Sequence, residues 1–427
     1  MSERVSAYGY AKPAEGSWTE HYPELGTAPI SYEDSISPEF YKLERKAIFQ
    51  RAWLNVGRVE QLPRNGSYFT KELAVAKTSV IVVRGLDGEV RAFHNICRHR
   101  GNKLVWQDFP REETSGSCRQ FVCKYHGWQY ALDGGCTFVQ QESEFFDLDK
   151  ADYGLVPMHC DVWAGFVFVN LDREPSQTLR DFLGPLVGAL EGYPFDQVTE
   201  RFSFTAEIPA NWKVFVDTLQ EQYHAPIVHR NQRPDTFDAP MQVYGFEAPH
   251  YQLDGPHRMF TSPGILPWNL PDDQVKPMER LVRSGLFGPW DAPDLGELPA
   301  GMNPGGCDPW GISLFLVFPN FGIQFWERGW YHTYHHWPTS PSSHRFELNL
   351  YFTPSNNARE RLAREMAAIT FREFALQDDN LIVAQQAMLE SGVVERFPLG
   401  DQEILCRHLH AVVAQWVDDW RNAPAAV

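Results

Sequence analysis

Two short segments of the chain each place a cysteine beside a histidine. The first contains Cys97 and His99, and the second, further along, contains Cys123 and His126. Thiolate and imidazole are the protein ligands that select zinc and iron–sulfur clusters. The two Cys/His pairs therefore predict a metal centre in the first third of the chain.

A structural zinc site with two cysteines and two histidines is the simpler alternative. Such sites more often pair like residues, whereas each segment here supplies one cysteine and one histidine. A Rieske [2Fe–2S] cluster needs two thiolates on one iron and two imidazoles on the other. Gly101 and Gly127 follow the pairs and allow tight loops that bring backbone N–H groups toward the bridging sulfides. We therefore favour a Rieske cluster bound by both pairs over zinc.

Acidic and histidine side chains recur farther along, at helical spacing. If the segment begins as a helix, Asp217, Glu221 and His224 lie at i, i+4 and i+7 on one face. For His229 to reach the same metal as His224, the helix must end or distort between them. Pro226 is placed to do this, because proline disfavours the helical conformation of the preceding residue. Two histidines and a carboxylate leave positions open on Fe(II) for O2 and substrate; ordinary core or surface histidines are the alternative.

The Cys/His pairs and the string N-W-K…E-x2-H-x4-H resemble the Rieske non-heme iron oxygenases, specifically the large catalytic (α) subunit of this aromatic-ring-hydroxylating dioxygenase family. The resemblance runs from about residue 40 to 230 and resumes in the C-terminal helical segment. It implies that His224 and His229 bind a mononuclear Fe(II). The family's third ligand is an Asp followed seven residues later by Gln, which selects Asp378, before Gln385, over its neighbour Asp379.

The resemblance also implies roles for the two upstream acids and for partner chains. Glu221 occupies the position of an acid that bridges an iron-bound and a cluster-bound histidine, and Asp217 either assists that network or only solvates the helix. In head-to-tail trimers, His126 of one subunit and His224 of its neighbour would be linked through Glu221. Electrons would come from NAD(P)H through a reductase and, in some systems, a ferredoxin. A small β subunit accompanies some family members.

The substrate is the least determined part of the prediction. Many aromatic residues precede the last helices and are typical both of a pocket for apolar ligands and of an ordinary core. We expect hydroxylation of an aromatic or other hydrophobic compound. The alternative is oxidative demethylation or hydroxylation of a quaternary amine or methylated compound, which aromatic cages also bind. Glutamate at position 221, where aspartate is commoner, is similar to the carnitine and glycine betaine branch. A pure electron carrier would not need residues 211–229. The candidate pocket residues are Phe246, Tyr251, Phe260, Trp268, Phe287, Trp290, Phe315, Phe325 and Trp330.

Composition narrows the classes of protein that fit these sites. The chain has 427 residues, and its 38 Lys and Arg against 55 Asp and Glu give a net charge of −17. This charge argues against nucleic acid or an anionic membrane as a partner. No apolar run approaches the ~18 residues of a membrane span, and no secretory signal is visible. Seven cysteines fit a few metal ligands better than a disulfide framework. We expect a cytoplasmic protein.

The elements that must position these residues indicate an α+β protein. Short alternating runs, including a hairpin of 79–85 and 89–95, predict an all-β Rieske domain over residues 45–171. Residues 1–44 and 172–427 would form the catalytic domain. There, strands near 313–318, 322–326, 330–337 and 345–352 precede a long helix over about 357–389. The family resemblance implies a helix-grip (START-like) arrangement with a mainly antiparallel sheet. Residues 231–311 predict a long functional loop or lid.

Overall fold

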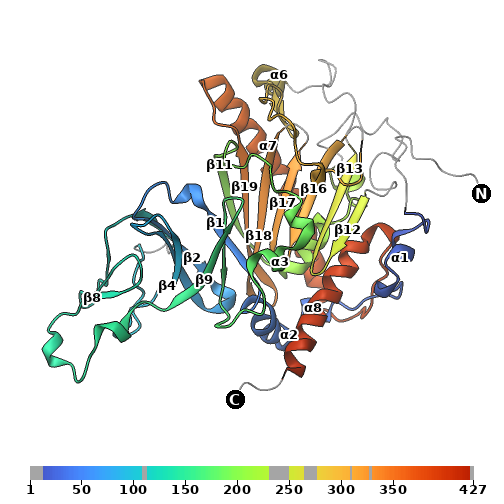
Figure 1. Cartoon of the computed structure of the whole chain (residues 1–427). Coiled ribbons are helices and arrows are strands. Elements are labelled where there is room, and N and C mark those ends of the chain that lie inside the picture. Colours follow the sequence, from blue (N-terminus) through green and yellow to red (C-terminus); the bar gives the residue numbers. More distant parts are fainter. Residues whose placement is uncertain are drawn as a thin grey trace, which may run out of the picture. The chain divides into compact units, whose positions relative to one another are not determined.

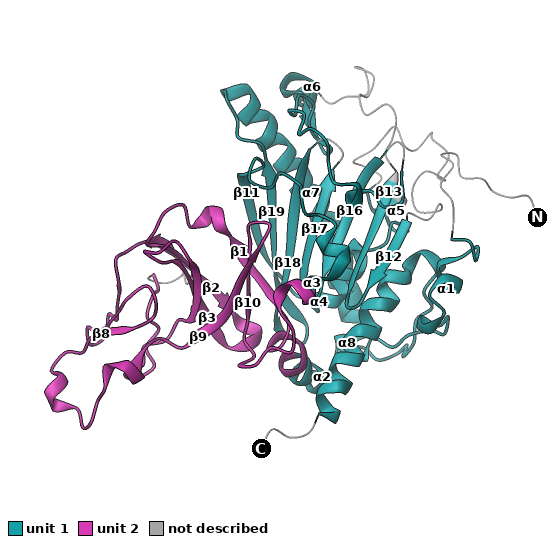
Figure 2. Cartoon of the chain, viewed as in Figure 1, with its two compact units in different colours: residues 1–44, 183–427 teal, residues 45–182 magenta. Residues whose placement is uncertain are grey.

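A computed structural model describes residues 13–107, 113–229, 250–263, 277–307, 310–326 and 329–423 (Figure 1). The chain divides into two compact units (Figure 2): unit 2 comprises residues 45–182, and unit 1 comprises residues 1–44 and 183–427. Unit 2 extends past residue 171, where we placed the domain boundary. Trp53 Nε1 donates to the Gln177 carbonyl at 3.2 Å, and Arg51 lies 3.5 Å from Asp172, so both contacts attach this stretch to unit 2.

Unit 2 is built on an antiparallel sheet of seven strands in the order β1-β10-β9-β4-β3-β2-β5. The predicted hairpin is present, with Val82 of β3 opposite Ala92 of β4. A second, small sheet has the order β6-β7-β8. The strands are β1 (Leu54–Arg58), β2 (Ser67–Leu73), β3 (Thr78–Arg84), β4 (Val90–His94), β5 (Ser115–Ser117), β6 (Phe121–Val122), β7 (Gln129–Tyr130), β8 (Cys136–Phe138), β9 (Pro157–Trp163) and β10 (Phe166–Asn170).

Unit 1 contains a second seven-stranded antiparallel sheet, in the order β11-β19-β18-β17-β16-β13-β12. The predicted α+β fold with two domains of this kind is confirmed. The expectation of one long loop over 231–311 is wrong for the described part, because the edge hairpin β12–β13 lies within it. The main strands are β11 (Glu200–Ile208), β12 (His250–Asp254), β13 (His257–Pro263), β16 (Trp310–Val317), β17 (Phe321–Trp326), β18 (Trp330–Ser340) and β19 (Ser343–Phe352); β14 (Ser284–Gly285) and β15 (Gly288–Pro289) form a separate pair.

Alternation along the strands gives this sheet two different faces. His332 of β18 packs on Phe371 of α7, with ring centroids 4.3 Å apart, so this face carries the long helix α7. The preceding residue, Tyr331, contacts Tyr193 on the opposite face. The helices are α1 (Trp18–His21), α2 (Pro38–Glu44), α3 (Leu179–Gly188), α4 (Trp212–Leu219), α5 (Ala225–Val228), α6 (Pro277–Val282), α7 (Ala358–Leu389) and α8 (Ile404–Asn422).

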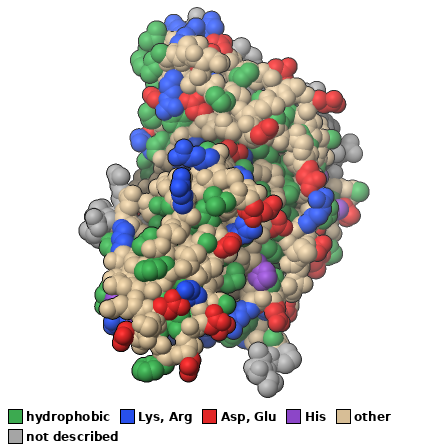
Figure 3. Space-filling view, turned by 60° about the vertical axis from the view of Figure 1, so that its left-hand side comes forward, with side chains coloured by type: hydrophobic (Ala, Val, Ile, Leu, Met, Phe, Trp, Pro, Cys, Tyr) green, Lys and Arg blue, Asp and Glu red, His purple; other side chains and the backbone are tan. Residues whose placement is uncertain are grey.

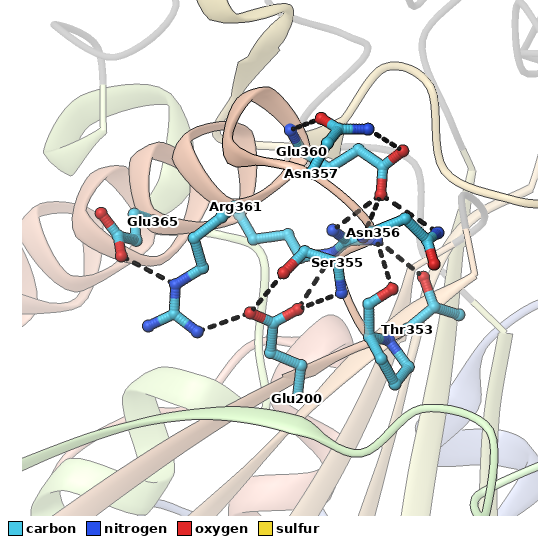
Figure 4. Close-up of polar contacts among 10 residues, drawn as sticks. Glu200, Thr353, Ser355, Asn356, Asn357, Glu360, Arg361 and Glu365 are labelled. Atoms are coloured by element: carbon cyan, nitrogen blue, oxygen red, sulfur yellow. Dashed lines mark hydrogen bonds and ion pairs between the residues drawn. The ribbon is translucent and has the colours of Figure 1, made fainter.

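The long helix α7 is fixed at both ends of its buried stripe. At its start, Asn357 caps the helix by accepting from the Glu360 backbone N–H. Figure 4 shows Glu200 of β11 accepting hydrogen bonds from Ser355 and pairing with Arg361 on the first turn of the helix. Farther along, Gln386 accepts from the backbone N–H of Asn211, the N-cap of α4, at 3.0 Å. These contacts fix the position of α7 relative to β11 and α4. The buried residues of α7 are Ala363, Arg364, Ala367, Ala368, Phe371, Ala375, Asp378, Ile382, Gln386 and Leu389.

A fully buried ion pair joins α2 to α4. Lys213 Nζ lies 2.6 Å from Glu44 Oε1, and neither side chain is exposed. Removing one partner of such a pair would leave an uncompensated buried charge, at a cost of about 3–5 kcal/mol. The pair therefore fixes the start of α4 against the N-terminal segment.

The surface carries no strong segregation of charge on the face shown in Figure 3, where acidic and basic side chains are interspersed. Among the described residues, no helix is long and apolar enough to cross a membrane.

Candidate metal centres

The two Cys/His segments of unit 2 form loops of the same construction. Gly101 donates its backbone N–H to the Cys97 carbonyl at 3.1 Å, and Gly127 donates to the Cys123 carbonyl at 3.0 Å. Both glycines are left-handed, with φ of +73° and +72°. A residue with a Cβ would be strained in that conformation, so glycine is needed to close each loop. Each loop thereby presents its cysteine and its histidine on one short turn.

The loops bring the four side chains into one region of unit 2. Both thiols are buried in the hydrophobic core, with Cys97 2% and Cys123 3% exposed. The rings of His99 and His126 are partly exposed and lie 4.7 Å apart, centroid to centroid. Trp128 stacks on His99 at 5.1 Å and orients that ring. The thiols therefore lie on the inner side of the region and the imidazoles toward solvent.

This arrangement fits a two-iron cluster better than a single zinc ion. Four ligands of one zinc, at about 2.0–2.3 Å from it, must lie within about 4.6 Å of one another. The Cys/His atoms do not: among the described residues, only another set of three groups meets within 4.8 Å. His99 Nδ1 is buried without a hydrogen-bond partner, as expected of a nitrogen that binds metal. The donor set therefore fits thiolates on one iron and imidazoles on the other.

Tyr130 contributes a polar contact that the sequence did not reveal. Its hydroxyl lies 3.3 Å from Cys97 Sγ and accepts from the backbone N–H of Arg98 at 3.0 Å. The hydroxyl is thereby free to donate to the sulfur, and such donors tune a cluster's reduction potential. Burial raises the pKa of the Cys97 thiol, and the Tyr130 contact opposes this effect.

In unit 1, the segment that carries the histidines departs from the predicted helix. Helix α4 ends at Leu219, before Glu221, so Asp217, Glu221 and His224 do not share one helical face. His224 is the N-cap of the short helix α5, and His229 is its C-cap. Pro226 lies in the first turn of α5, where its missing N–H costs nothing, so it begins a helix and does not end one. One helical turn thus separates the two histidines.

The two histidines meet Asp378 of α7. His229 Nε2 lies 3.4 Å and His224 Nε2 3.7 Å from Asp378 Oδ1, close enough for all three atoms to bind one ion. Each imidazole is oriented by an acceptor on its other nitrogen. Glu221 accepts from His224 Nδ1, and Gln377 Oε1 accepts from His229 Nδ1 at 2.9 Å. Both Nδ1 atoms therefore carry the proton, and both Nε2 lone pairs face Asp378.

Asp378 and Asp379 differ in environment, although they are adjacent. Asp378 is 3% exposed, and Oδ1 has no hydrogen-bond partner among the described residues. Burial raises the pKa of Asp378 to about 7, against the lowering effect of His224. Asp379 is half-buried and lies away from the histidines, and burial raises its pKa to about 6. The structure therefore brings Asp378 to the site and leaves Asp379 outside it.

Asp217 belongs to a different buried network. Its Oδ2 accepts from the Tyr32 hydroxyl at 2.9 Å and lies 3.1 Å from His410 Nε2, while His410 Nδ1 lies 2.7 Å from Asp34. Gln220 donates to Asp217 Oδ1 at 2.8 Å. Asp217 therefore neither contacts the site histidines nor solvates the helix; it anchors the last turn of α4, immediately before Glu221. Tyr32 and His410 come from distant segments, so the local sequence carried no signal for these two contacts.

The predicted aromatic residues are divided between environments. Trp330 stacks on Trp326 at 5.0 Å on the helix-facing side of the sheet, whereas Phe325 packs on Tyr193 at 4.8 Å on the other side. Alternation along a strand forces this division. Phe374 of α7, which we did not predict, stacks directly on His229 at 3.7 Å. Phe246 and Trp268 lie outside the described residues.

Family models match both units. The model for the ring hydroxylating alpha subunit (catalytic domain) matches residues 195–419, and the model for the Rieske [2Fe-2S] domain matches residues 52–152. The chain belongs to the ring-hydroxylating alpha subunit family. The predicted resemblance is thereby confirmed, and so are the two cofactors of that family, a Rieske [2Fe–2S] cluster and a mononuclear iron that uses O2.

Individual relatives are monooxygenases named for glycine betaine and for choline. The chain is 34% identical over 184 residues to the glycine betaine monooxygenase oxygenase subunit of Pseudomonas aeruginosa, covering 43% of this chain and 41% of the relative. It is 34% identical over 226 residues to the chloroplastic choline monooxygenase of Spinacia oleracea, covering 50% and 48%. The matched region thus spans about half or less of these relatives' length.

A solved structure shows the same fold over nearly the whole chain. It is the structure of a quaternary ammonium Rieske monooxygenase, and it superimposes on this chain with a TM-score of 0.69. The description of that structure concerns carnitine oxidation by gut microbiota and inter-subunit electron transfer. The match covers 95% of this chain and 99% of that chain, at 20% identity. This likeness concerns the fold.

The different environments of the adjacent aspartates give a first prediction. Asp378→Asn should lose the mononuclear iron, so that total iron falls from about three atoms per chain to about two. Asp379→Asn should keep all three. Metal analysis measures the total, and the visible absorbance of the cluster serves as the control. The reverse pattern would show that Asp379 is the ligand.

The buried network gives a second prediction. Burial alone would lower the pKa of His410, but the carboxylates of Asp34 and Asp217 raise it to about 10. This group therefore stabilises the fold fully below its unfolded pKa of about 6.5, and the contribution is lost as pH rises toward 10, at up to ~1.4 kcal/mol per pH unit. His410→Gln should flatten the fall in unfolding midpoint between pH 7 and 10, whereas His21→Gln, on an exposed histidine, should not. Equal slopes for wild type and His410→Gln would contradict the assignment.

Proposed function

We propose that this protein is the terminal oxygenase component of a Rieske-type system and that its substrate is a quaternary amine or a related methylated compound. The observation that carries the reaction class is the convergence of His224, His229 and Asp378, each imidazole oriented by an acceptor on Nδ1. Three protein ligands on one face of an iron leave the opposite face for O2 and substrate.

We assign the metal ligands as follows. His224, His229 and Asp378 hold the mononuclear Fe(II), and the pairs Cys97/His99 and Cys123/His126 hold the cluster. Bound in these places, the two centres supply O2 activation and single electrons. The chain's own residues contribute orientation: Glu221 and Gln377 fix the imidazole tautomers, and Phe374 packs one ring in place.

Glu221 has the chemistry needed for electron coupling. Its Oε2 accepts from the His224 backbone N–H at 3.0 Å and its Oε1 from the ring, so the carboxylate is locked to that imidazole. We propose that it also accepts from His126 of a neighbouring subunit in a head-to-tail homotrimer. Electrons would reach the cluster from NAD(P)H through a reductase. Asp217 acts indirectly. Its hydrogen-bond network holds the end of α4, and Glu221 follows shortly after that end.

The substrate class rests on the relatives. The two relatives described above act, by name, on glycine betaine and on choline. This favours the alternative substrate class, a quaternary amine, over the aromatic or other hydrophobic compound expected from the sequence. Glutamate at position 221 agrees with the same branch, and aromatic side chains on the helix-facing side of the sheet suit a quaternary ammonium group.

The direct test of this function supplies the protein with a competent Rieske reductase, NADH and a panel of compounds. Glycine betaine, choline or carnitine should stimulate O2 uptake and yield a demethylated or hydroxylated product detectable by mass spectrometry. Naphthalene and similar arenes should give neither. Product formation from an arene, with no response to any amine, would restore the aromatic assignment.

The bridging role of Glu221 predicts a separable defect. Glu221→Gln keeps the size of the side chain but removes its charge, so cluster and iron content should stay near wild type. Chemical reduction of the cluster should remain normal, while turnover should fall about 10- to 100-fold. Single-turnover oxidation of the reduced cluster measures the step directly. Turnover like that of wild type, with NADH use still coupled to product, would exclude the role.

A further inference from the structure

Two polar side chains lie together in an otherwise apolar part of the unit 1 sheet. His332 of β18 and Gln324 of β17 are direct cross-strand partners, so both project to the helix-facing side. Their other cross-strand neighbours on this face are Leu350 and Leu314. His332 is fully buried and Gln324 is 7% exposed. Buried polar groups in such surroundings are costly unless they have partners.

The protonation state of His332 is fixed by its neighbour. The indole Nε1–H of Trp326, which can only donate, lies 3.2 Å from His332 Nδ1. Nδ1 must therefore be the acceptor. Burial holds the pKa of His332 well below its usual value, so the ring is neutral and its single proton is on Nε2. Nε2–H is thus a donor in a known position.

This donor has no acceptor in the described part of the chain. His332 Nε2 is buried and without a hydrogen-bond partner there. An unsatisfied buried donor costs roughly 1–3 kcal/mol. The neighbouring amide of Gln324 offers a second N–H group on the adjacent strand. The two side chains can therefore address one acceptor group from two directions.

The pair lies near the candidate iron site, along the same stripe of α7. His332 contacts Phe371, which contacts Phe374, and Phe374 stacks on His229. Tyr334 is the next residue on the same face of β18; burial, and to a lesser extent the charge of Asp378, raises its pKa. From Phe371 to Asp378 the helix rises about 10 Å. A continuous chain of ring contacts therefore links His332 to the candidate iron ligand His229.

We propose that His332 and Gln324 bind a carboxylate of the substrate through His332 Nε2–H and the Gln324 amide N–H. This inference rests on the proposed function and deepens it: the substrate is a betaine-type zwitterion, with a quaternary ammonium group at one end and a carboxylate at the other. Two N–H donors on neighbouring strands match the two oxygens of a carboxylate. A hydroxyl group has a single oxygen and gains less from the pair.

The test compares three probes in steady-state turnover with a reductase. Glycine betaine carries a carboxylate, choline a hydroxyl, and propyltrimethylammonium is of similar size with neither group. A variant that lacks the His332 or the Gln324 donor loses a hydrogen bond to the charged carboxylate. Its KM for glycine betaine should rise about 10- to 100-fold, with kcat nearly unchanged. KM for propyltrimethylammonium should stay the same, and the change for choline should be smaller.

Matched variants separate the donor from the packing. In His332→Asn, the side-chain oxygen can still accept from Trp326 while the Nε2 donor is lost. In His332→Gln, an amide N–H reaches toward the Nε2 position and should restore binding in part. Gln324→Leu tests the second donor without touching His332. Thr333→Val changes a buried polar residue on the opposite face of β18 and should leave all KM values unchanged.

Iron content and cluster absorbance confirm that each variant contains both metal centres. If a His332 variant does not fold, Gln324→Leu still tests the carboxylate site. A wild-type protein that uses glycine betaine while both His332→Asn and Gln324→Leu keep its KM would overturn the carboxylate site alone. Equal KM increases for all three probes would do the same, because they would indicate a general packing defect. A wild-type protein that turns over none of the amines would overturn the proposed function and this inference together.

Discussion

The structure of unit 1 depends on the burial of one carboxylate, that of Asp378. Asp378 is held between two imidazole nitrogens with almost no exposure. Burial, with the charges of Glu221 and Asp379 adding to it, raises its pKa to about 7 against the lowering effect of His224. Such a group is unfavourable in an apolar protein interior unless a cation neutralises it. The long buried stripe of α7, its capped start and the Gln386 contact to α4 supply the packing that offsets this cost. Glu221 and Gln377 then orient the imidazoles so that their lone pairs face the carboxylate. The buried carboxylate and the two oriented lone pairs together favour a bound cation.

The two metal centres are assembled by different means, and this difference explains what could be predicted. Each Cys/His loop closes within a few residues, so its glycine and ligands could all be identified from one short segment. The second centre joins residues from α5 and α7, far apart in sequence, and only the histidines had a local pattern. The end of α4 at Leu219 was missed because it depends on tertiary contacts of Asp217 and Gln220 with the N-terminal segment and β13. Helical periodicity alone continues through that point.

Asp378 was selected from the sequence through its spacing to Gln385, yet Gln385 is exposed and the neighbouring Gln386 is the buried residue. Phe371, Ala375, Asp378, Ile382 and Gln386 recur at intervals of three and four along α7, which places Asp378 on the inner face and Asp379 beside it. A carboxylate within a mainly apolar stripe is rare unless it has a partner. Periodicity and residue type together identify the inward-facing acid without reference to any motif.

The aromatic content of the strands indicates little about the substrate. Strand alternation sends half of the aromatic residues of β16 to β18 to the far side of the sheet, where they pack as ordinary core. Only side chains on the helix-facing side can meet a ligand near Asp378, and most of them are apolar. In such a setting the few polar groups decide which substrate is preferred, because an unpaired buried donor penalises every ligand that lacks an acceptor. Apolar contacts give affinity for many compounds, whereas a neutral N–H with a fixed tautomer distinguishes among them. The specificity of this fold is therefore expected to depend on single polar positions such as 332, which can change while the metal ligands and their supporting network stay the same.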